Sequence, residues 1–238
     1  MDRLTGAAEL LDGPLDDPEV LIGNLRDLRR VNRWLGGVAL SRTAIDTLVG
    51  RQADTGTAIT LLDIGTGAAD IPVALLADWH RRDRHIEVTA IDSRPEVIFA
   101  ARMARPAIDR LKRLTLATAD GRSLPYPDDS FDVVHASMVV HHLDPADAVA
   151  LLREMRRVSR RGVVINDLRR GWLYWWAARV LAWVGTNNRF SRHDGPLSVR
   201  RAYSSGELRA LLAVAGLRPI SETRDRFGHR WAIAAVRV

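Results

Sequence analysis

The fold is decided by residues 61–70, which read LLDIGTGAAD. Before this stretch lies the apolar run AITLLDI at residues 58–64, and after it the segment 70–82 repeats its apolar residues at helical spacing. A short apolar run stopped by Gly65 is typical of a strand buried on both faces. Glycines at a strand-to-helix turn let the backbone bend sharply and come close to a ligand. The stretch therefore predicts a ligand-binding turn at the carboxyl end of a strand.

The same alternation of strands and helices continues along the rest of the chain. Further strands are predicted at residues 86–92, 111–120, 131–137, 162–168, 217–225 and 229–238. Further helices are predicted at residues 95–105, 144–159 and 204–216. Strands that alternate with helices pair in parallel through right-handed crossovers. We therefore expect an α/β fold, with a doubly wound sheet and helices on both of its faces.

The N-terminal region is expected to form a helical cap, residues 1–54, in front of one domain at residues 55–238. Between residues 18 and 35 the apolar residues recur at helical spacing, and the Gly36-Gly37 pair ends this helix before a second one begins. The first dozen residues carry no such pattern. We therefore expect them to be poorly anchored.

The charges around the glycine turn indicate what kind of ligand it takes. In the dinucleotide fingerprint G-x-G-x-x-G the third position is glycine, but here it is Asp70. A carboxylate at the start of the helix, with Asp63 just before the turn, is unfavourable beside a pyrophosphate. The pair favours a cofactor with a positive charge, such as S-adenosylmethionine, which has an ammonium, a sulfonium and no phosphate. An NAD-dependent oxidoreductase is therefore a distant alternative.

Two more carboxylates follow neighbouring predicted strands. Asp92 ends the strand at residues 86–92, where an acid accepts hydrogen bonds from both ribose hydroxyls of a nucleotide. Asp120 ends the next strand, within reach of an adenine amino group. Either aspartate alone is typical of a turn or a helix cap. Three acids at the carboxyl ends of three consecutive strands favour a binding site.

These segments make the chain resemble the class I S-adenosylmethionine-dependent methyltransferases. The resemblance covers about residues 58–168, through the segments 63–67, 91–92, 119–128, 131–134, 139–143 and 152–158. It implies a Rossmann-like, seven-stranded, mostly parallel sheet whose last strand is antiparallel. At Asp70 many members carry glycine, so Asp70 either contacts the cofactor or caps the helix.

The resemblance also implies roles for individual residues toward S-adenosylmethionine. The methionine portion would be held by Asp63, Gly65, Thr66 and Gly67, the ribose by Asp92 and Ser93, and the adenine by Asp120 and Gly121. Outside the resemblance, the segment Asn32-Arg33-Trp34 of the predicted cap is expected to close over the cofactor, where Arg33 would meet its carboxylate.

Histidines are the candidates for the catalytic base, because methylation of a phenol requires its deprotonation near neutral pH. His141 and His142 follow the strand at residues 131–137, on the edge that faces the cofactor. His193 lies in the insertion at about residues 169–203, a region from which such enzymes commonly build the acceptor pocket. His135 lies inside an apolar strand and is expected to be a core histidine. A structural role for any of the first three remains open.

The insertion contains a helix, residues 172–184, that is apolar nearly all round. The segment 171–184 holds four of the seven tryptophans and a single charged residue, Arg179. Such a helix is buried in the core or in a dimer interface, lines a hydrophobic acceptor pocket, or touches a membrane. It is too short to span a bilayer.

Composition narrows the function classes. The absence of cysteine excludes disulfides, thiolate nucleophiles and Cys-ligated zinc, and no metal site is expected. The net charge of +6 comes almost wholly from arginines in scattered pairs, so we expect no nucleic-acid partner. The acidic N-terminus lacks the pattern of a secretory signal, and no stretch is long enough for a membrane span, which favours a cytoplasmic protein.

We therefore expect an enzyme that O-methylates a small hydrophobic phenol or quinol, such as a polyketide-type product. The alternatives are a C- or N-methyltransferase for another small molecule, and a non-catalytic S-adenosylmethionine-binding partner protein. An RNA methylase is a further alternative, which a steep salt dependence of RNA binding would reveal. A homodimer is left open.

Overall fold

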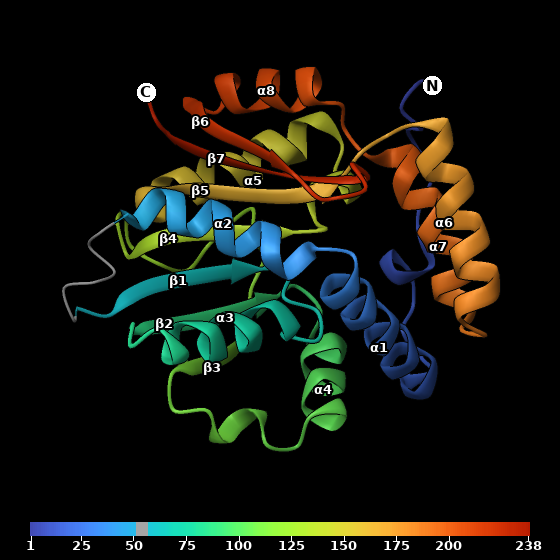
Figure 1. The fold of residues 1–238 in the computed structure, drawn as a ribbon, viewed down its shortest axis with the longest axis horizontal. Coiled ribbons are helices and arrows are strands. Elements are labelled where there is room, and N and C mark those ends of the chain that lie inside the picture. The colour runs from blue at the N-terminus through green and yellow to red at the C-terminus, as the bar shows by residue number, and fades with distance from the viewer. Residues whose placement is uncertain (51–56) are drawn as a thin grey trace.

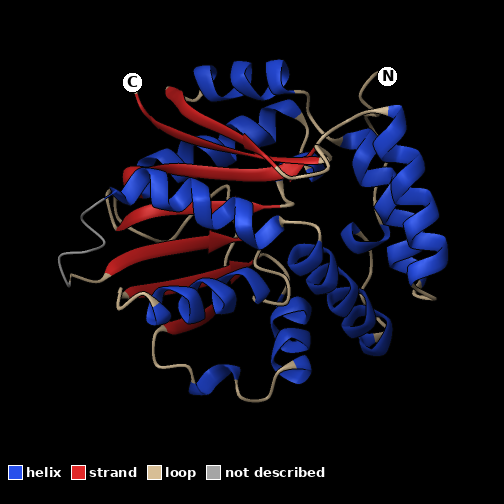
Figure 2. Cartoon of the chain, viewed as in Figure 1, coloured by secondary structure: helices blue, strands red, loops and turns tan. Residues whose placement is uncertain are grey.

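The computed structural model describes residues 1–50 and 57–238, and these contain one seven-stranded sheet (Figures 1 and 2). Its strand order is β3-β2-β1-β4-β5-β7-β6. The strands are β1 (Ile59–Ile64), β2 (Ile86–Asp92), β3 (Leu114–Thr118), β4 (Phe131–Ser137), β5 (Ser159–Leu168), β6 (Leu217–Arg224) and β7 (Arg230–Arg237). The first five strands are parallel, whereas β7 runs antiparallel to both β5 and β6. The predicted fold class is confirmed.

Helices cover both faces of this sheet. On one face α2 (Gly37–Val49) and α3 (Asp70–Arg81) share an apolar cluster with β1 and β2. On the other face α5 (Pro145–Val158) and α8 (Ser205–Val214) pack against β4 and β5. The central strand β4 is thus buried along its whole length, whereas the edge strand β3 is partly exposed.

A third group of helices lies at the end of the sheet to which the parallel strands point (Figure 1). It consists of α1 (Pro18–Trp34), α4 (Pro95–Ala104), α6 (Trp172–Gly185) and α7 (Arg189–Arg201). The described residues also form the short 3-10 turns η1 (Leu10–Asp12), η3 (Ile108–Arg110) and η4 (Val140–His142). Because ligands bind outside the carboxyl ends of parallel strands, this group surrounds the expected site.

The cap helices form as the sequence predicts. The Asp17 side chain accepts hydrogen bonds from the amides of Glu19 and Val20 and so begins α1. Gly36, with a φ of 84°, separates α1 from α2 in a conformation that favours glycine. Because α2 contributes Leu40 and Ile45 to the core beneath the sheet, it shares that core rather than forming a separate layer. The expected boundary between residues 54 and 55 lies outside the described residues.

The first dozen residues are anchored, so the expectation that they lie loosely is wrong. The amide of Leu4 donates a hydrogen bond to the carbonyl of Arg200 at 2.9 Å, and Nε of Arg3 donates to the carbonyl of Arg201 at 2.7 Å. Glu9 is buried. These contacts are polar, and for that reason the spacing of apolar residues did not reveal them.

The insertion folds into two packed helices, α6 and α7. The sequence predicted α6 but not α7, because α7 contains Gly195 and Pro196, which normally interrupt helices. No residue of α6 is buried, and the indoles of Trp172, Trp176 and Trp183 are each more than half exposed. Burial of α6 in the core of the chain is therefore excluded. Among the described residues no helix is both long and apolar enough to cross a membrane.

Candidate active site

The glycine turn between β1 and α3 depends on its two glycines. Gly65 and Gly67 both have positive φ, 65° and 53°. A Cβ on Gly65 would overlap the side chain of Val139, which follows β4. The amide of Thr66 donates to the carbonyl of Ile91 at 2.9 Å and thereby ties the turn to β2. The turn is thus held close to the ends of both neighbouring strands.

Three of the predicted cofactor-binding acids gather around this turn. Asp63 ends β1 and is buried, and Asp70 opens α3 and is also buried. Asp92 ends β2, where its carboxylate accepts hydrogen bonds from the amides of Gly67 and Arg94, each at 3.1 Å. These three carboxylates lie around the turn at one edge of the sheet, and their role toward the cofactor stays a prediction.

The electrostatics of the three acids favour a positively charged ligand. Burial raises the pKa of Asp70 and of Asp92, and the negative charge of Asp63 raises both further, against opposing hydrogen bonds. Oδ2 of Asp70 and Oγ1 of Thr66 are buried without a hydrogen-bond partner in the protein. A cationic group that donated hydrogen bonds to these two oxygens would offset the cost of burying them.

His135 and Ser41 support Asp63 from beneath. Nδ1 of His135 lies 2.5 Å from Oδ1 of Asp63, and Nε2 lies 2.8 Å from Oγ of Ser41 on α2. A carboxylate only accepts, so His135 donates from Nδ1 and accepts the serine hydroxyl at Nε2. His135 is fully buried with both ring nitrogens paired, as expected of a core histidine.

Arg230 of β7 joins this support to the cap. Its guanidinium donates to Asn166 at 2.6 Å, to Asn32 at 2.7 Å and to Ser137 at 2.6 Å. Burial lowers the pKa of Arg230 to about 10, yet it stays charged at neutral pH. Asn32 in turn hydrogen-bonds Asp70, so the network reaches the glycine turn. The sequence did not reveal it, because its members are up to 198 residues apart.

Two other predicted cofactor-binding residues, Asp120 and Arg33, are exposed to solvent. Asp120, after β3, is exposed and pairs with Arg122 at 2.9 Å, a hydrogen bond that lowers the pKa of Asp120. Arg33 is exposed on α1, with its guanidinium over the ring of Trp34, while its neighbour Asn32 faces inward.

Ser93 and Gly121 flank these acids. Ser93 is exposed directly after Asp92. A Cβ on Gly121 would lie 2.7 Å from Ile64 and 2.8 Å from Leu151, so glycine lets the end of β3 approach the end of β1.

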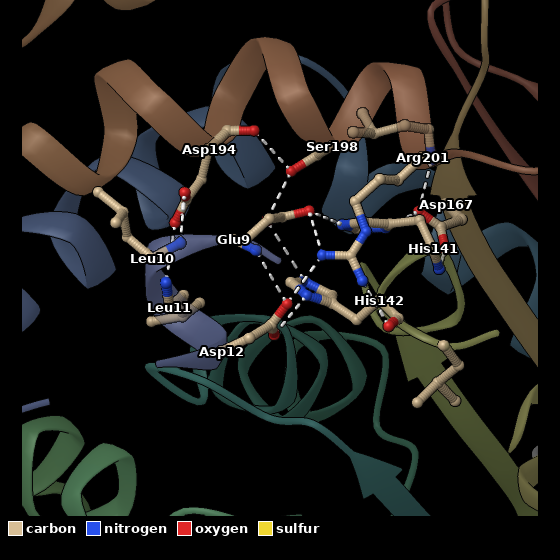
Figure 3. A network of polar contacts seen from close by, with 12 residues as sticks. Glu9, Leu10, Leu11, Asp12, His141, His142, Asp167, Asp194, Ser198 and Arg201 are labelled. Carbon is tan, nitrogen blue, oxygen red and sulfur yellow. Dashed lines mark hydrogen bonds and ion pairs between the residues drawn. The ribbon is translucent and has the colours of Figure 1, made fainter. Parts of the chain in front are cut away.

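The structure brings two of the three candidate catalytic histidines together (Figure 3). His141 is buried, and its Nδ1 lies 2.6 Å from Oδ1 of Asp167 at the end of β5. Nδ1 of His142 lies 2.8 Å from Oδ1 of Asp12 on η1. The two imidazole rings lie 4.3 Å apart. Both histidines are thus oriented by carboxylates, a feature that reactive and metal-binding histidines share.

His193 is placed apart from this pair, on α7. It is half exposed, and its Nδ1 lies 2.8 Å from Oδ1 of Asp194. The same carboxylate accepts the amides of Leu10 and Leu11, so Asp194 anchors the N-terminal segment.

The sequence reasoning missed Glu9, Asp12 and Asp167. Asp167 could have been found, since it ends a parallel strand just as Asp92 does. Glu9 and Asp12 could not, because they come from a segment with no apolar pattern. A cavity of about 190 Å³ lies beside His142 and Asp12, and Arg3, Asp144 and Arg201 also line it.

Comparison with known proteins shows what the central part of the chain is similar to. Residues 62–165 match the family described as a methyltransferase domain. The malonyl-[acyl-carrier protein] O-methyltransferase of Halorhodospira halophila is 35% identical over 99 residues, which are 42% of this chain and 30% of that protein. The demethylmenaquinone methyltransferase of Roseiflexus is 30% identical over 109 residues, 45% of this chain and 41% of that protein.

The chain thus spans less than half the length of these curated relatives. A solved S-adenosylmethionine-dependent methyltransferase from Aquifex aeolicus has the same fold, with a TM-score of 0.62 and 21% identity, covering 93% of this chain and 99% of its own. The matched domain includes the glycine turn and β1 to β5 up to Ile165. Residues 62–165 therefore match a methyltransferase domain, and the chain has the fold of a solved S-adenosylmethionine-dependent methyltransferase.

Proposed function

We propose that this chain transfers a methyl group from S-adenosylmethionine to an oxygen of a small hydrophobic phenol or quinol. The observation that carries the proposal is the group of carboxylates around the glycine turn, of which Asp63 and Asp70 are buried and Asp92 is partly buried. When bound, the sulfonium of the cofactor supplies a methyl group that is activated for in-line attack. The proposal includes a cytoplasmic location and a role in small-molecule biosynthesis.

The residues present fit this cofactor. Unpaired acceptors at Asp70 and Thr66 match its ammonium, and the raised pKa values of Asp70 and Asp92 fall when a cation binds beside them. Asp92 holds the turn through only one hydrogen bond per oxygen, so its carboxylate retains acceptor capacity for the ribose hydroxyls.

We also assign contacts with the cofactor to residues other than these three acids. The methionine portion is assigned to Asp63, Gly65, Thr66, Gly67 and Asp70, its carboxylate to Arg33, the ribose to Asp92 and Ser93, and the adenine to Asp120 and Gly121. Arg122 competes with the adenine for Asp120, so we expect this exposed ion pair to open when cofactor binds.

The acceptor is assigned to the side of His141 and His142. Val139 packs against Gly65, and His141 and His142 come two and three residues later, which supports placing the acceptor beside the methionine end of the cofactor. An acceptor hydroxyl must lose its proton as its oxygen forms the bond to the methyl carbon and the carbon–sulfur bond breaks onto sulfur. We assign activation of the hydroxyl to these two histidines, with His193 as the more distant candidate.

The relatives support a methyl acceptor of this general kind. One is named for O-methylation, another for a demethylmenaquinone, and others for C-methylation in quinone biosynthesis, so the choice of oxygen over carbon is the part of the proposal that the experiment must test. The exposed apolar side chains of α6, which packs against α7, suit contact with a hydrophobic acceptor.

The experiment is to supply cofactor with a ¹³C-labelled methyl group together with a panel of phenols and quinols, and to follow the label by NMR. We expect the label in a methoxy group. A label on carbon or nitrogen, or no transfer to any acceptor despite cofactor binding, would contradict the proposal. Asp109→Asn, an exposed aspartate paired with Arg102, is the control variant for the assay.

A further inference from the structure

Three ligand-type side chains converge where the N-terminal segment crosses the end of β4 (Figure 3). Glu9, His141 and His142 each offer one atom to a common point, and these atoms all lie within 4.8 Å of one another. Glu9 and His141 are almost fully buried. Each has a polar atom without a hydrogen-bond partner, Oε1 of Glu9 and Nε2 of His141.

The distances are too long for hydrogen bonds and suit a shared ion. Nε2 of His141 lies 3.7 Å from Oε1 of Glu9, and Nε2 of His142 lies 3.8 Å from Oε2 of Glu9. Two ligand atoms bound tetrahedrally to one metal at about 2.1 Å are roughly 3.4 Å apart. Each of these two distances exceeds that value by a few tenths of an ångström, and the three ligand atoms all lie within 4.8 Å of one another, so small side-chain adjustments would bring them into coordination.

The surroundings of the two imidazoles are those of metal ligands. Each ring donates its Nδ1 proton to a carboxylate, His141 to Asp167 and His142 to Asp12, which leaves both Nε2 atoms as acceptors. Metal-binding histidines almost always donate their other ring N–H in this way. Oε2 of Glu9 accepts a hydrogen bond from Ser198 at 2.8 Å, which fixes the carboxylate.

The local charge balance also favours a divalent cation. Glu9, Asp12 and Asp167 carry three negative charges, and Arg201, which lies 2.8 Å from Asp12 and 3.6 Å from Glu9, carries one positive charge. With both histidines neutral the cluster has a formal charge of −2. The cavity beside His142 gives the cluster an open side.

We propose that Glu9, His141 and His142 bind one divalent transition-metal ion, of the zinc or iron(II) class, on the acceptor side of the site. Two histidines and one carboxylate are a ligand set that such ions take, with further positions left for a substrate or water. Its place in the chemistry rests on the proposed function: an ion here would lower the pKa of an acceptor hydroxyl that reaches it. The binding itself does not depend on the acceptor.

The test is calorimetric titration of the chelator-treated full chain with Zn²⁺. We expect one ion per chain, and no binding of Mg²⁺, which prefers an all-oxygen shell. Glu9→Gln and His141→Asn are expected to abolish Zn²⁺ binding, and Asp12→Asn to weaken it about ten- to a hundredfold. His80→Ala, which removes an exposed histidine of α3, is expected to bind as the wild type does.

A measurement on the wild type covers the case in which a variant fails to fold. With ¹⁵N-labelled histidines, Co²⁺ is expected to shift and broaden the ring signals of His141 and His142 most strongly. Absence of stoichiometric Zn²⁺ binding, or ring signals of these histidines unchanged by Co²⁺, would overturn the inference. If the chain binds no Zn²⁺ and still transfers the methyl group, the metal site is overturned and the proposed function stays intact. Absence of cofactor binding would overturn only the function.

Discussion

At the scale of single residues, Asp70 and Asp92 link cofactor binding to pH. Burial and the charge of Asp63 raise the pKa of both above the ordinary value of 3.8, and a bound cation favours their ionised forms. We therefore expect S-adenosylmethionine to release protons on binding, and its affinity to fall as the pH is lowered through these raised values. Calorimetry at about pH 5 in two buffers of different ionisation heat measures the protons released. Proton uptake would contradict this assignment.

Asp132 links stability to pH in the opposite region of the sheet. Burial alone would raise the pKa of Asp132, but hydrogen bonds from Arg160, Thr60 and Arg161 outweigh it and lower the pKa to about 2. Because this is below the ordinary value of 3.8, the stabilisation is complete above about pH 5 and is lost as the pH falls toward 2.

We expect Asp132→Asn to lower the free energy of unfolding by about 2 kcal/mol at pH 7. The difference from the wild type should shrink between about pH 5 and pH 3 in urea unfolding curves. A difference that is constant over this range would show that the carboxylate charge is not what stabilises the start of β4.

At the scale of elements, α6 and α7 differ in what they bury. Trp176 and Trp183 of α6 are exposed, whereas Phe190 of α7 is buried against α1. We expect the double variant Trp176→Ser/Trp183→Ser to change the free energy of unfolding by less than about 1 kcal/mol. Phe190→Ala should cost about 3 kcal/mol or more. Thermal unfolding distinguishes the two, and equal destabilisation would contradict the observed packing.

The elements also show which part of the fold could be predicted. Parallel strands are buried on both faces, so β1, β2 and β4 were readable as apolar runs within one residue of their observed bounds. β5 begins three residues earlier than expected, since the polar Ser159 pairs with Phe131 and a register irregularity separates this pair from that of Val133 with Gly162. α7 was missed because Pro196 occurs inside the helix.

At the scale of the whole molecule, Arg230 connects the sheet, the cap and the glycine turn. Its three side-chain contacts, with Asn32, Ser137 and Asn166, are all buried. We expect Arg230→Met to destabilise the chain by about 3–5 kcal/mol, because it leaves buried polar partners unsatisfied. The exposed Arg218 provides the control, Arg218→Met, which should have little effect in urea unfolding. Comparable losses in the two variants would contradict a central role for Arg230.

The candidate site was predictable only in part, because some of its residues come from distant parts of the sequence. Asp63 and Asp92 follow adjacent parallel strands, so strand order alone places them together. Glu9 and Arg230 reach the site from opposite ends of the sequence, through polar contacts that no local pattern encodes. The position of Asp63 and Asp92 at one edge of the sheet was therefore predictable from the sequence, whereas the network of Arg230 and the group of Glu9, His141 and His142 were not.

The central claim is that the carboxylates of Asp63, Asp70 and Asp92 around the glycine turn bind S-adenosylmethionine. Its most direct test is calorimetric titration of the wild type and of Asp92→Asn with this cofactor, with Asp109→Asn as the exposed control. We predict one site per chain in the wild type and in the control. In Asp92→Asn we predict a loss of about 3 kcal/mol, roughly a hundredfold in affinity. No binding by the wild type, or undiminished binding by Asp92→Asn, would contradict the claim.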